Sequence, residues 1–118
     1  MKDLAPDILR QRLLVEGFYT REVGRDEVEE YLVGVARQLG LRTYAPPIIH
    51  SPGGQGREIN QGYDAFVPLI DSGIALYVWT GRRFFSTVIY TCKRFEVQDA
   101  LRFTRSFFGA AEVEHTDF

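Results

Sequence analysis

The chain of 118 residues contains one cysteine, one methionine, one tryptophan and two histidines. A single cysteine excludes a disulfide within the chain and is typical of proteins of a reducing compartment. No apolar run reaches the roughly 18 residues of a membrane span, and the first six residues, Met-Lys-Asp-Leu-Ala-Pro, lack the hydrophobic region of a signal peptide. We therefore expect a cytoplasmic protein.

The sequence also lacks an excess of charge of either sign, with 14 basic and 16 acidic residues and a net charge of −2. This balance gives no sign of a nucleic-acid-binding surface or of a polybasic membrane patch. Hydrophobic residues make up 45% of the chain and aromatic residues 14%, which indicates a well-packed globule. The length predicts one domain over residues 1–118, and we expect no metal site.

Apolar spacing predicts the elements of an α+β domain. Strands are expected over residues 13–19, 41–49, 62–70, 70–79, 84–92 and 110–113, and helices over residues 26–39 and 97–108. Two consecutive prolines, Pro46 and Pro47, restrict the second strand to an edge or bend it. The two short helices would cover one face of a mainly antiparallel sheet, which makes a two-layer α/β sandwich.

The longest apolar run, residues 70–79, contains the only tryptophan, Trp79, and leads to the only cysteine, Cys92. The polar residues 80–83 separate two strand-like segments and predict a β-hairpin. A three-residue loop would place Ser72 directly opposite Cys92 on one face of the sheet. A two-residue or four-residue loop would place them on opposite faces, and the sequence leaves this register open.

Two further features allow a functional interpretation. Residues 50–61 form a loop that is rich in glycine, but no Lys-Ser or Lys-Thr pair follows it as in a phosphate-binding loop, so we expect a mobile loop beside the site. Glu16 interrupts the first strand. It is either a solvent-facing residue at a sheet edge or a carboxylate placed at a site.

The run from Asp71 to Trp79, Asp-Ser-Gly-Ile-Ala-Leu-Tyr-Val-Trp, resembles the Glu-Ser-His-Ile-Ser-Ile-His-Thr-Trp segment of bacterial S-adenosylmethionine decarboxylase proenzymes. Thr91-Cys92 matches the Thr-Cys pair of that family at the same distance from the serine. Residues 14–19 resemble its first strand, Leu-Val-Ala-Glu-Phe-Tyr, and residues 62–71 resemble its Gly-Val-Ser-Gly strand. The resemblance extends over nearly the whole chain.

This resemblance implies a proenzyme in which the Ser72 hydroxyl attacks the carbonyl of Asp71. Cleavage would leave a pyruvoyl group, derived from Ser72, whose ketone is the electron sink for decarboxylation. Cys92 would return a proton to the product, Trp79 would lie near the adenosine and Glu16 would correspond to the first-strand acid of the family. The family also implies a homodimer.

Several family residues are replaced in this chain. The histidine that assists cleavage is Tyr77, the serine on the preceding strand is Asp64, and the histidine after the cleavage serine is Gly73. The glutamate that binds ribose is replaced by Gly81. Tyrosine is a poor base near neutral pH because its reference pKa is about 10. Asp64 could replace the base if it lies near Ser72, and Gly73 allows unusual backbone geometry.

Two hypotheses follow from the resemblance. The first is a pyruvoyl-dependent decarboxylase of S-adenosylmethionine or a related amino acid, active in polyamine biosynthesis and cleaved between Asp71 and Ser72. The second is an unprocessed homologue that binds a ligand, regulates a partner or performs another reaction on S-adenosylmethionine. The expected catalytic residues are Ser72, Cys92, Asp71, Tyr77 and Asp64, and the expected substrate-binding residues are Trp79 and Glu16.

Overall fold

A computed structural model describes residues 1–51 and 53–118, so Pro52 of the expected loop lies outside the described residues. The regular elements are β1 (Gln11–Phe18), α1 (Arg25–Gln38), β2 (Ile48–His50), β3 (Gly62–Leu69), β4 (Ser72–Trp79), β5 (Phe84–Thr91), α2 (Val97–Phe108) and β6 (Val113–Asp117). A short 3₁₀ helix, Glu58–Asn60, precedes β3. The strands and helices therefore follow one another in the predicted order, with the strands β2 to β5 between the two helices.

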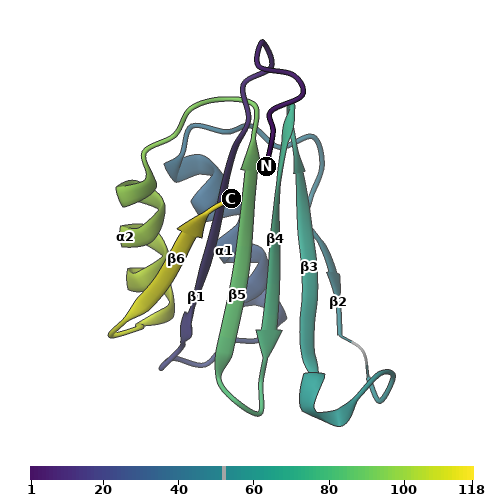
Figure 1. Ribbon diagram of the computed structural model, residues 1–118. Helices are drawn as coiled ribbons and strands as arrows, with labels where there is room; N and C mark the ends of the chain where they lie inside the picture. The colour runs from purple at the N-terminus through teal and green to yellow at the C-terminus, as the bar shows by residue number, and fades with distance from the viewer. Residues whose placement is uncertain (52) are drawn as a thin grey trace.

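The strands form one sheet in the order β2-β3-β4-β5-β1-β6, as Figure 1 shows. All neighbouring strands are antiparallel. Three consecutive strands, β3 to β5, form a meander at the centre, and β1 lies between β5 and the C-terminal strand β6. The first strand of the chain is therefore an interior strand of the sheet.

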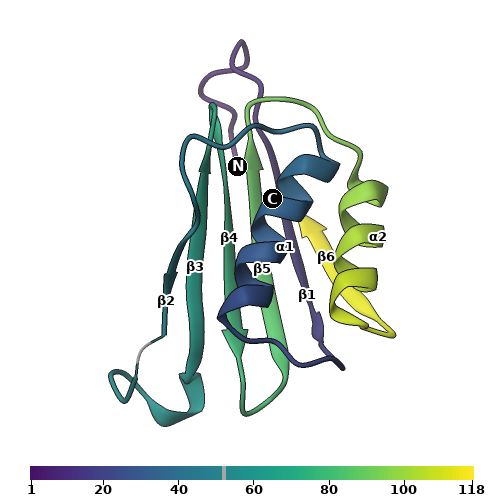
Figure 2. The same cartoon turned by 180° about the vertical axis from the view of Figure 1, so that it is seen from behind.

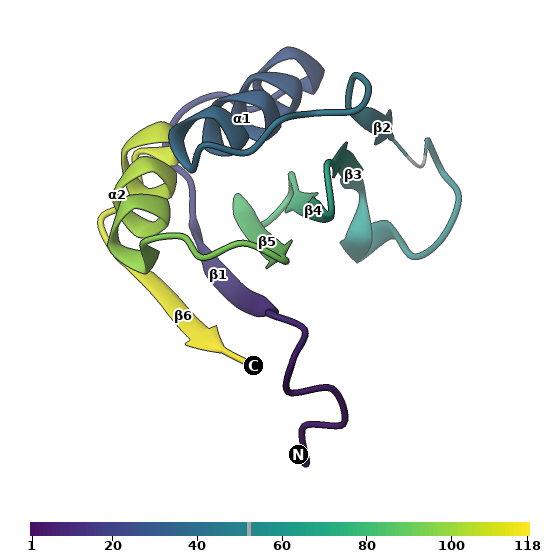
Figure 3. The ribbon, with the colours of Figure 1, turned by 90° about the horizontal axis from the view of Figure 1, so that it is seen from above.

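Both helices cover the same face of the sheet, as the view from behind and the view from above show (Figures 2 and 3). Alternate side chains of the central strands are fully buried on this face, among them Ile74, Leu76, Phe85 and Ile89. They pack with the apolar stripes of α1 and α2, whose buried members include Tyr31, Leu32 and Phe108. The predicted two-layer α/β sandwich is confirmed.

The helix ends have local causes. The backbone N–H of Gly24 donates to the Glu27 carboxylate at 2.7 Å at the start of α1. α2 ends at Gly109, which adopts the left-handed conformation (φ 62°) that glycine tolerates best. Within the described part of the chain, neither helix has the length and apolar character needed to cross a bilayer.

Two predicted strand bounds are wrong. β2 is limited to Ile48–His50, because Pro46 and Pro47 supply no N–H groups for a ladder, and upstream only the isolated bridge between Thr43 and Leu69 forms among the described residues. The last strand is β6 (Val113–Asp117) rather than residues 110–113. Its mostly polar side chains gave no apolar alternation, and its pairing with β1 is a tertiary contact.

Candidate functional site

The face of the sheet that the helices do not cover, named the open face here, carries most of the expected site residues. Aromatic side chains of four strands, Phe18, Phe66, Tyr77 and Tyr90, are exposed on it. Such a cluster of exposed apolar side chains is typical of binding and interaction surfaces. The open face is therefore the place where a ligand or a second chain would be bound.

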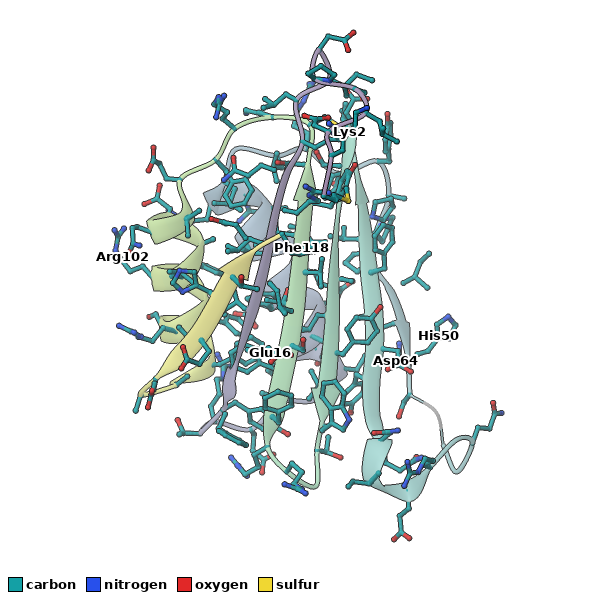
Figure 4. All side chains as sticks on the ribbon, viewed as in Figure 1. Lys2, Glu16, His50, Asp64, Arg102 and Phe118 are labelled. Carbon is teal, nitrogen blue, oxygen red and sulfur yellow. The ribbon has the colours of Figure 1, made fainter. Side chains whose placement is uncertain are left out.

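A row of polar side chains crosses the open face from edge to edge. In order from β2 to β6 it consists of His50, Asp64, Tyr77, Ser86, Glu16 and Glu114, each the direct cross-strand partner of the next. Figure 4 labels Glu16, Asp64 and His50 at a similar level of the sheet. This set is named the polar row. Direct partners on one face have Cβ atoms about 4.5–5.5 Å apart, close enough for their side chains to interact.

Glu16 occupies the interior of the sheet, since β1 is flanked by β5 and β6. Its carboxylate accepts a hydrogen bond from the Ser86 hydroxyl at 2.8 Å, and the side chain is half-buried. Of the two interpretations of Glu16, the sheet-edge one is wrong. The carboxylate is held in place on the open face by a neighbouring strand.

Ser72 begins β4 and lies beside the end of β5. The hairpin loop has four residues, because Trp79 pairs with Phe84, and the partner of Ser72 is Thr91 rather than Cys92. The four-residue loop therefore forms, and with this loop strand alternation places the Ser72 and Cys92 side chains on opposite faces of the sheet. The serine and cysteine still meet, since the backbone N–H of Cys92 donates to the Ser72 hydroxyl at 3.3 Å. The Cys92 thiol is free and exposed.

The expected cleavage point lies in a tight turn between β3 and β4. Asp71 adopts a left-handed backbone conformation (φ 60°), which is uncommon for a residue with a side chain. Gly73 has no positive φ, so the conformational freedom that glycine allows is not used there. Instead, a Cβ atom at Gly73 would lie 2.7 Å from the Phe66 ring. The conformational strain is at Asp71, directly before Ser72.

An apolar cavity of about 380 Å³ adjoins Ser72 on the open face. It is lined by Phe66, Asp71, Ser72, Gly73, Ala75, Val88 and Tyr90. Its mostly apolar walls would limit the access of water to a reactive carbonyl. Ser72 lines this cavity at the start of β4, and Ser72 and Asp71 are the two positions that cleavage would separate.

The remaining expected site residues lie further along β4. Asp64 and Tyr77 are cross-strand partners, and Tyr77 is five positions from Ser72, roughly 17 Å at 3.3 Å per residue. Trp79 is seven positions away, roughly 23 Å. The chain therefore brings Ser72, Asp71 and Cys92 together at the start of β4. It brings Asp64, Tyr77 and Trp79 together towards the other end of this strand.

A second cavity, of about 630 Å³, lies at the β2 end of the polar row. It is lined by His50, Ser51, Gln55, Gly56, Arg57, Asn60, Asp64, Tyr77, Val78 and Trp79. The sequence indicated Asp64, Tyr77 and Trp79 but missed His50, Arg57 and Asn60. No local pattern identifies these three, because their place depends on the pairing of β2 with β3 and on the course of the loop.

Among the described residues, no group of three or more His, Cys, Asp or Glu side chains could hold a metal ion. The Trp79 indole N–H donates to the Asn60 side-chain oxygen at 2.9 Å, and its ring lies 5.2 Å from that of Phe84. These contacts fix the indole at the mouth of the second cavity. The chemistry available on the open face is therefore that of hydroxyls, carboxylates and aromatic rings.

A six-stranded antiparallel sheet with two helices on one face is the fold of the S-adenosylmethionine decarboxylase class. A sequence profile described as S-adenosylmethionine decarboxylase matches residues 12–118, nearly the whole chain. The chain belongs to this family. A comparison with curated proteins finds no significant sequence match.

The fold is also similar to a solved structure, the crystal structure of the adenosylmethionine decarboxylase from Aquifex aeolicus VF5. The TM-score is 0.73 with 14% sequence identity, and the match covers 94% of this chain and 89% of the other. At this identity the likeness establishes the fold. The substitutions at Asp64, Tyr77, Gly73 and Gly81 concern the site, and they have to be judged from the geometry of this chain.

Proposed function

We propose that this chain is a pyruvoyl-dependent decarboxylase of S-adenosylmethionine or a related amino acid, acting in polyamine biosynthesis. The observation that carries the proposal is the contact between the Ser72 hydroxyl and the Cys92 backbone N–H beside the strained Asp71. Family membership supplies the reaction class, and the open-face cavity at Ser72 supplies room for a small substrate.

In the proposed cleavage, the Ser72 oxygen attacks the carbonyl carbon of Asp71. The peptide C–N bond breaks, an ester C–O bond forms and the amide nitrogen takes up the proton that the hydroxyl loses. Elimination of the ester and hydrolysis then consume one water and release ammonia. The Cys92 N–H favours the negative charge that develops on the Ser72 oxygen, and the left-handed Asp71 raises the energy of the uncleaved turn.

The resulting pyruvoyl group would supply a ketone that withdraws electrons from the bond to the departing carboxylate. We assign the return of a proton to the product to Cys92, whose backbone N–H contacts the Ser72 hydroxyl and whose thiol is free and exposed. The apolar lining of Phe66, Val88 and Tyr90 would shield the reacting carbon from water.

A homodimer is part of the proposal. Within one chain, Tyr77 and Asp64 are roughly 17 Å from Ser72 along the strands, too far to assist cleavage there. A second copy that packs against the open face in the opposite direction would carry its own Asp64 and Tyr77 towards Ser72 of the first. The exposed aromatic side chains of this face support such a contact.

The same separation favours a second candidate function. If no partner supplies a base, Ser72 remains uncleaved and the chain acts as a binding or regulatory protein of this family. The cavity at Asp64, Tyr77 and Trp79 would then be its ligand site. This alternative keeps the fold and dispenses with the pyruvoyl group.

The intact mass of freshly purified protein under denaturing conditions distinguishes the two candidates. We expect two fragments that separate between Asp71 and Ser72, the second with a blocked pyruvoyl terminus. Ser72→Ala should stay uncut, because the attacking oxygen is gone. Cys92→Ala should still be cleaved, since the contact with Ser72 uses the backbone, but its decarboxylation should be slower by roughly 10²-fold or more.

A single species of the full chain mass would contradict the decarboxylase proposal and favour the uncleaved alternative. Cleavage of Ser72→Ala would remove Ser72 from the mechanism. Full decarboxylase activity in Cys92→Ala would show that another group returns the proton.

A further inference from the structure

A further cavity lies at the C-terminal end of α1, where the chain leaves this helix and runs across to β2 (Figure 2). It is lined by residues of the second half of α1 and by residues 40–43, and it is named the α1 cavity here. Its volume of about 460 Å³ lies within the range of small-molecule sites. None of the lining residues belongs to a strand, so the α1 cavity is separate from the open face.

The charged side chains of this lining are all positive. They are Arg37 and Arg42, and no acidic residue is among the lining residues. In the described ranges 1–51 and 53–118, neither guanidinium forms an ion pair with a carboxylate of the chain. An arginine fork binds a phosphate group through paired, charge-assisted hydrogen bonds. The lining therefore favours a ligand that carries two negative charges on one compact group.

The end of α1 would oppose such a ligand if its last carbonyl groups were unpaired, because they carry the negative end of the helix dipole. The Leu41 N–H donates to the Ala36 carbonyl at 2.8 Å, and the Gly40 N–H donates to the Arg37 carbonyl at 3.1 Å. The Lys93 ammonium group donates to the Gly40 carbonyl at 2.9 Å. The negative end of the helix is therefore compensated, and Lys93 adds a third positive charge beside the α1 cavity.

The residues that follow the cavity are joined to the end of β3. The Ile70 N–H donates to the Arg42 carbonyl at 2.9 Å, and the Tyr44 N–H donates to the Pro68 carbonyl at 3.0 Å. Ile70 directly precedes Asp71, the residue with the left-handed backbone conformation. A ligand that holds Arg42 would therefore also restrain the end of the strand that leads into this turn.

We propose that the α1 cavity binds the phosphate group of a small molecule between Arg37 and Arg42, and that the bound phosphate stabilises the backbone contact between Arg42 and Ile70. The cavity is larger than a phosphate ion, and the apolar side chains of Val33 and Ala36 are part of its lining. A phosphate monoester with a small organic group therefore fits it better than the free ion. The site uses no residue of the open face, so the inference holds whether or not the chain is cleaved.

The test is a calorimetric titration of the purified wild-type chain with propyl phosphate. The ionic strength is held constant, because salt screens exposed charges. Inorganic phosphate and the uncharged 1-propanol are titrated in the same way. We expect saturable binding of propyl phosphate, weaker binding of inorganic phosphate and none of 1-propanol at equal concentration. The order of the two phosphates distinguishes a monoester from the free ion as the ligand.

Variants of this chain identify the groups involved. Arg37→Gln and Arg42→Gln should each weaken the binding of propyl phosphate by roughly tenfold or more, the usual effect of losing a charge-assisted contact. Arg105→Gln is the matched control. It removes an equal charge from the last turn of α2, outside the lining of the α1 cavity, and should leave binding unchanged.

Amide hydrogen exchange followed by NMR tests the effect on the backbone. The Ile70 amide should exchange more slowly when propyl phosphate is bound, because the ligand restrains Arg42, whose carbonyl accepts this hydrogen bond. The same addition should not slow this amide in Arg42→Gln. The Thr20 amide, which donates to the Phe108 carbonyl at the end of α2, is the control and should be unaffected.

Absence of saturable binding of both phosphates would overturn the proposal, and so would equal losses of affinity in Arg42→Gln and Arg105→Gln. Binding without slower exchange of the Ile70 amide would overturn the effect on the turn. None of these outcomes bears on cleavage at Ser72, which the mass measurement on the wild-type chain decides independently.

Discussion

At the residue scale, the backbone positions the candidate reaction centre more than charged side chains do. The Ser72 hydroxyl is held by the N–H of Cys92, and the strain before it lies in the φ angle of Asp71. A turn held by backbone groups tolerates changes in the surrounding side chains. This explains how the turn can keep its geometry although Gly73 and Tyr77 replace residues of the family pattern.

Position 62 requires glycine for a steric reason. A Cβ atom there would lie 1.7 Å from the carbonyl oxygen of Val78, so the backbones of β3 and β4 would have to separate. We expect Gly62→Ala to lower the free energy of unfolding by about 1–3 kcal/mol, the range of overpacked substitutions. Urea unfolding followed by circular dichroism measures this loss.

Gly81→Ala is the matched control, because no atom lies within 4 Å of the position that its Cβ would take. It should change the unfolding free energy by less than about 0.5 kcal/mol. Equal stability of Gly62→Ala and the wild-type chain would show that the two strands can move apart without cost.

At the element scale, the two helices are joined by one buried polar contact. The Tyr31 hydroxyl of α1 and the Thr104 hydroxyl of α2 are 2.8 Å apart, and both side chains are fully buried. Aromatic rings surround this bond, with Phe108 at 4.9 Å and Phe107 at 5.4 Å from the Tyr31 ring. The bond fixes how α1 and α2 pack, since apolar contacts alone have little direction.

Burial raises the pKa of Tyr31 from 10.0 to about 12. The folded state therefore keeps this proton more tightly than the unfolded state, and the stability it confers is complete below pH 10. It falls as the pH rises from 10 towards 12, by up to roughly 3 kcal/mol. Tyr31→Phe should lack this part of the alkaline decline in a series of urea unfolding curves.

At neutral pH, Tyr31→Phe should also lose about 1–3 kcal/mol, because the Thr104 hydroxyl is left buried without its partner. Tyr44→Phe serves as control, since Tyr44 is exposed outside the sheet and should affect neither quantity. Identical alkaline profiles of Tyr31→Phe and the wild-type chain would show that Tyr31 does not contribute to this decline.

At the scale of the whole molecule, two layers leave one face of the sheet without a cover. Exposed aromatic side chains on that face are an unusual feature of a protein that acts alone. A second copy packed against them would bury these rings, consistent with the proposed homodimer. The large faces of two sheets can also meet over many residues at once.

Sedimentation velocity tests this arrangement. The wild-type chain should sediment at twice the chain mass, and Phe18→Asp should shift it towards the monomer, because an unpaired charge would be buried between the sheets. Phe18 is 61% exposed on the open face. Tyr44→Asp, at a residue 67% exposed outside the sheet, should leave the dimer intact. A monomeric wild-type chain at micromolar concentration would contradict the proposal.

The sequence by itself determined the types of the elements, the end of α2 at Gly109 and the meeting of Ser72 with the end of the next strand. Apolar periodicity, glycine and loop length act locally, so they can be interpreted from neighbouring residues. It could not decide the hairpin register, because loops of three and four residues are both compatible with residues 80–83.

Only the tertiary structure decided where the polar residues meet. The polar row joins His50, Asp64 and Tyr77 of the consecutive strands β2 to β4 with Glu16 of β1, which is far from them in sequence and enters the sheet beside β5. The tertiary structure also places Asp64 away from Ser72, although the sequence allowed the two residues to be close. Strands that are far apart in sequence pair only when the whole sheet assembles, and no local sequence pattern encodes that pairing.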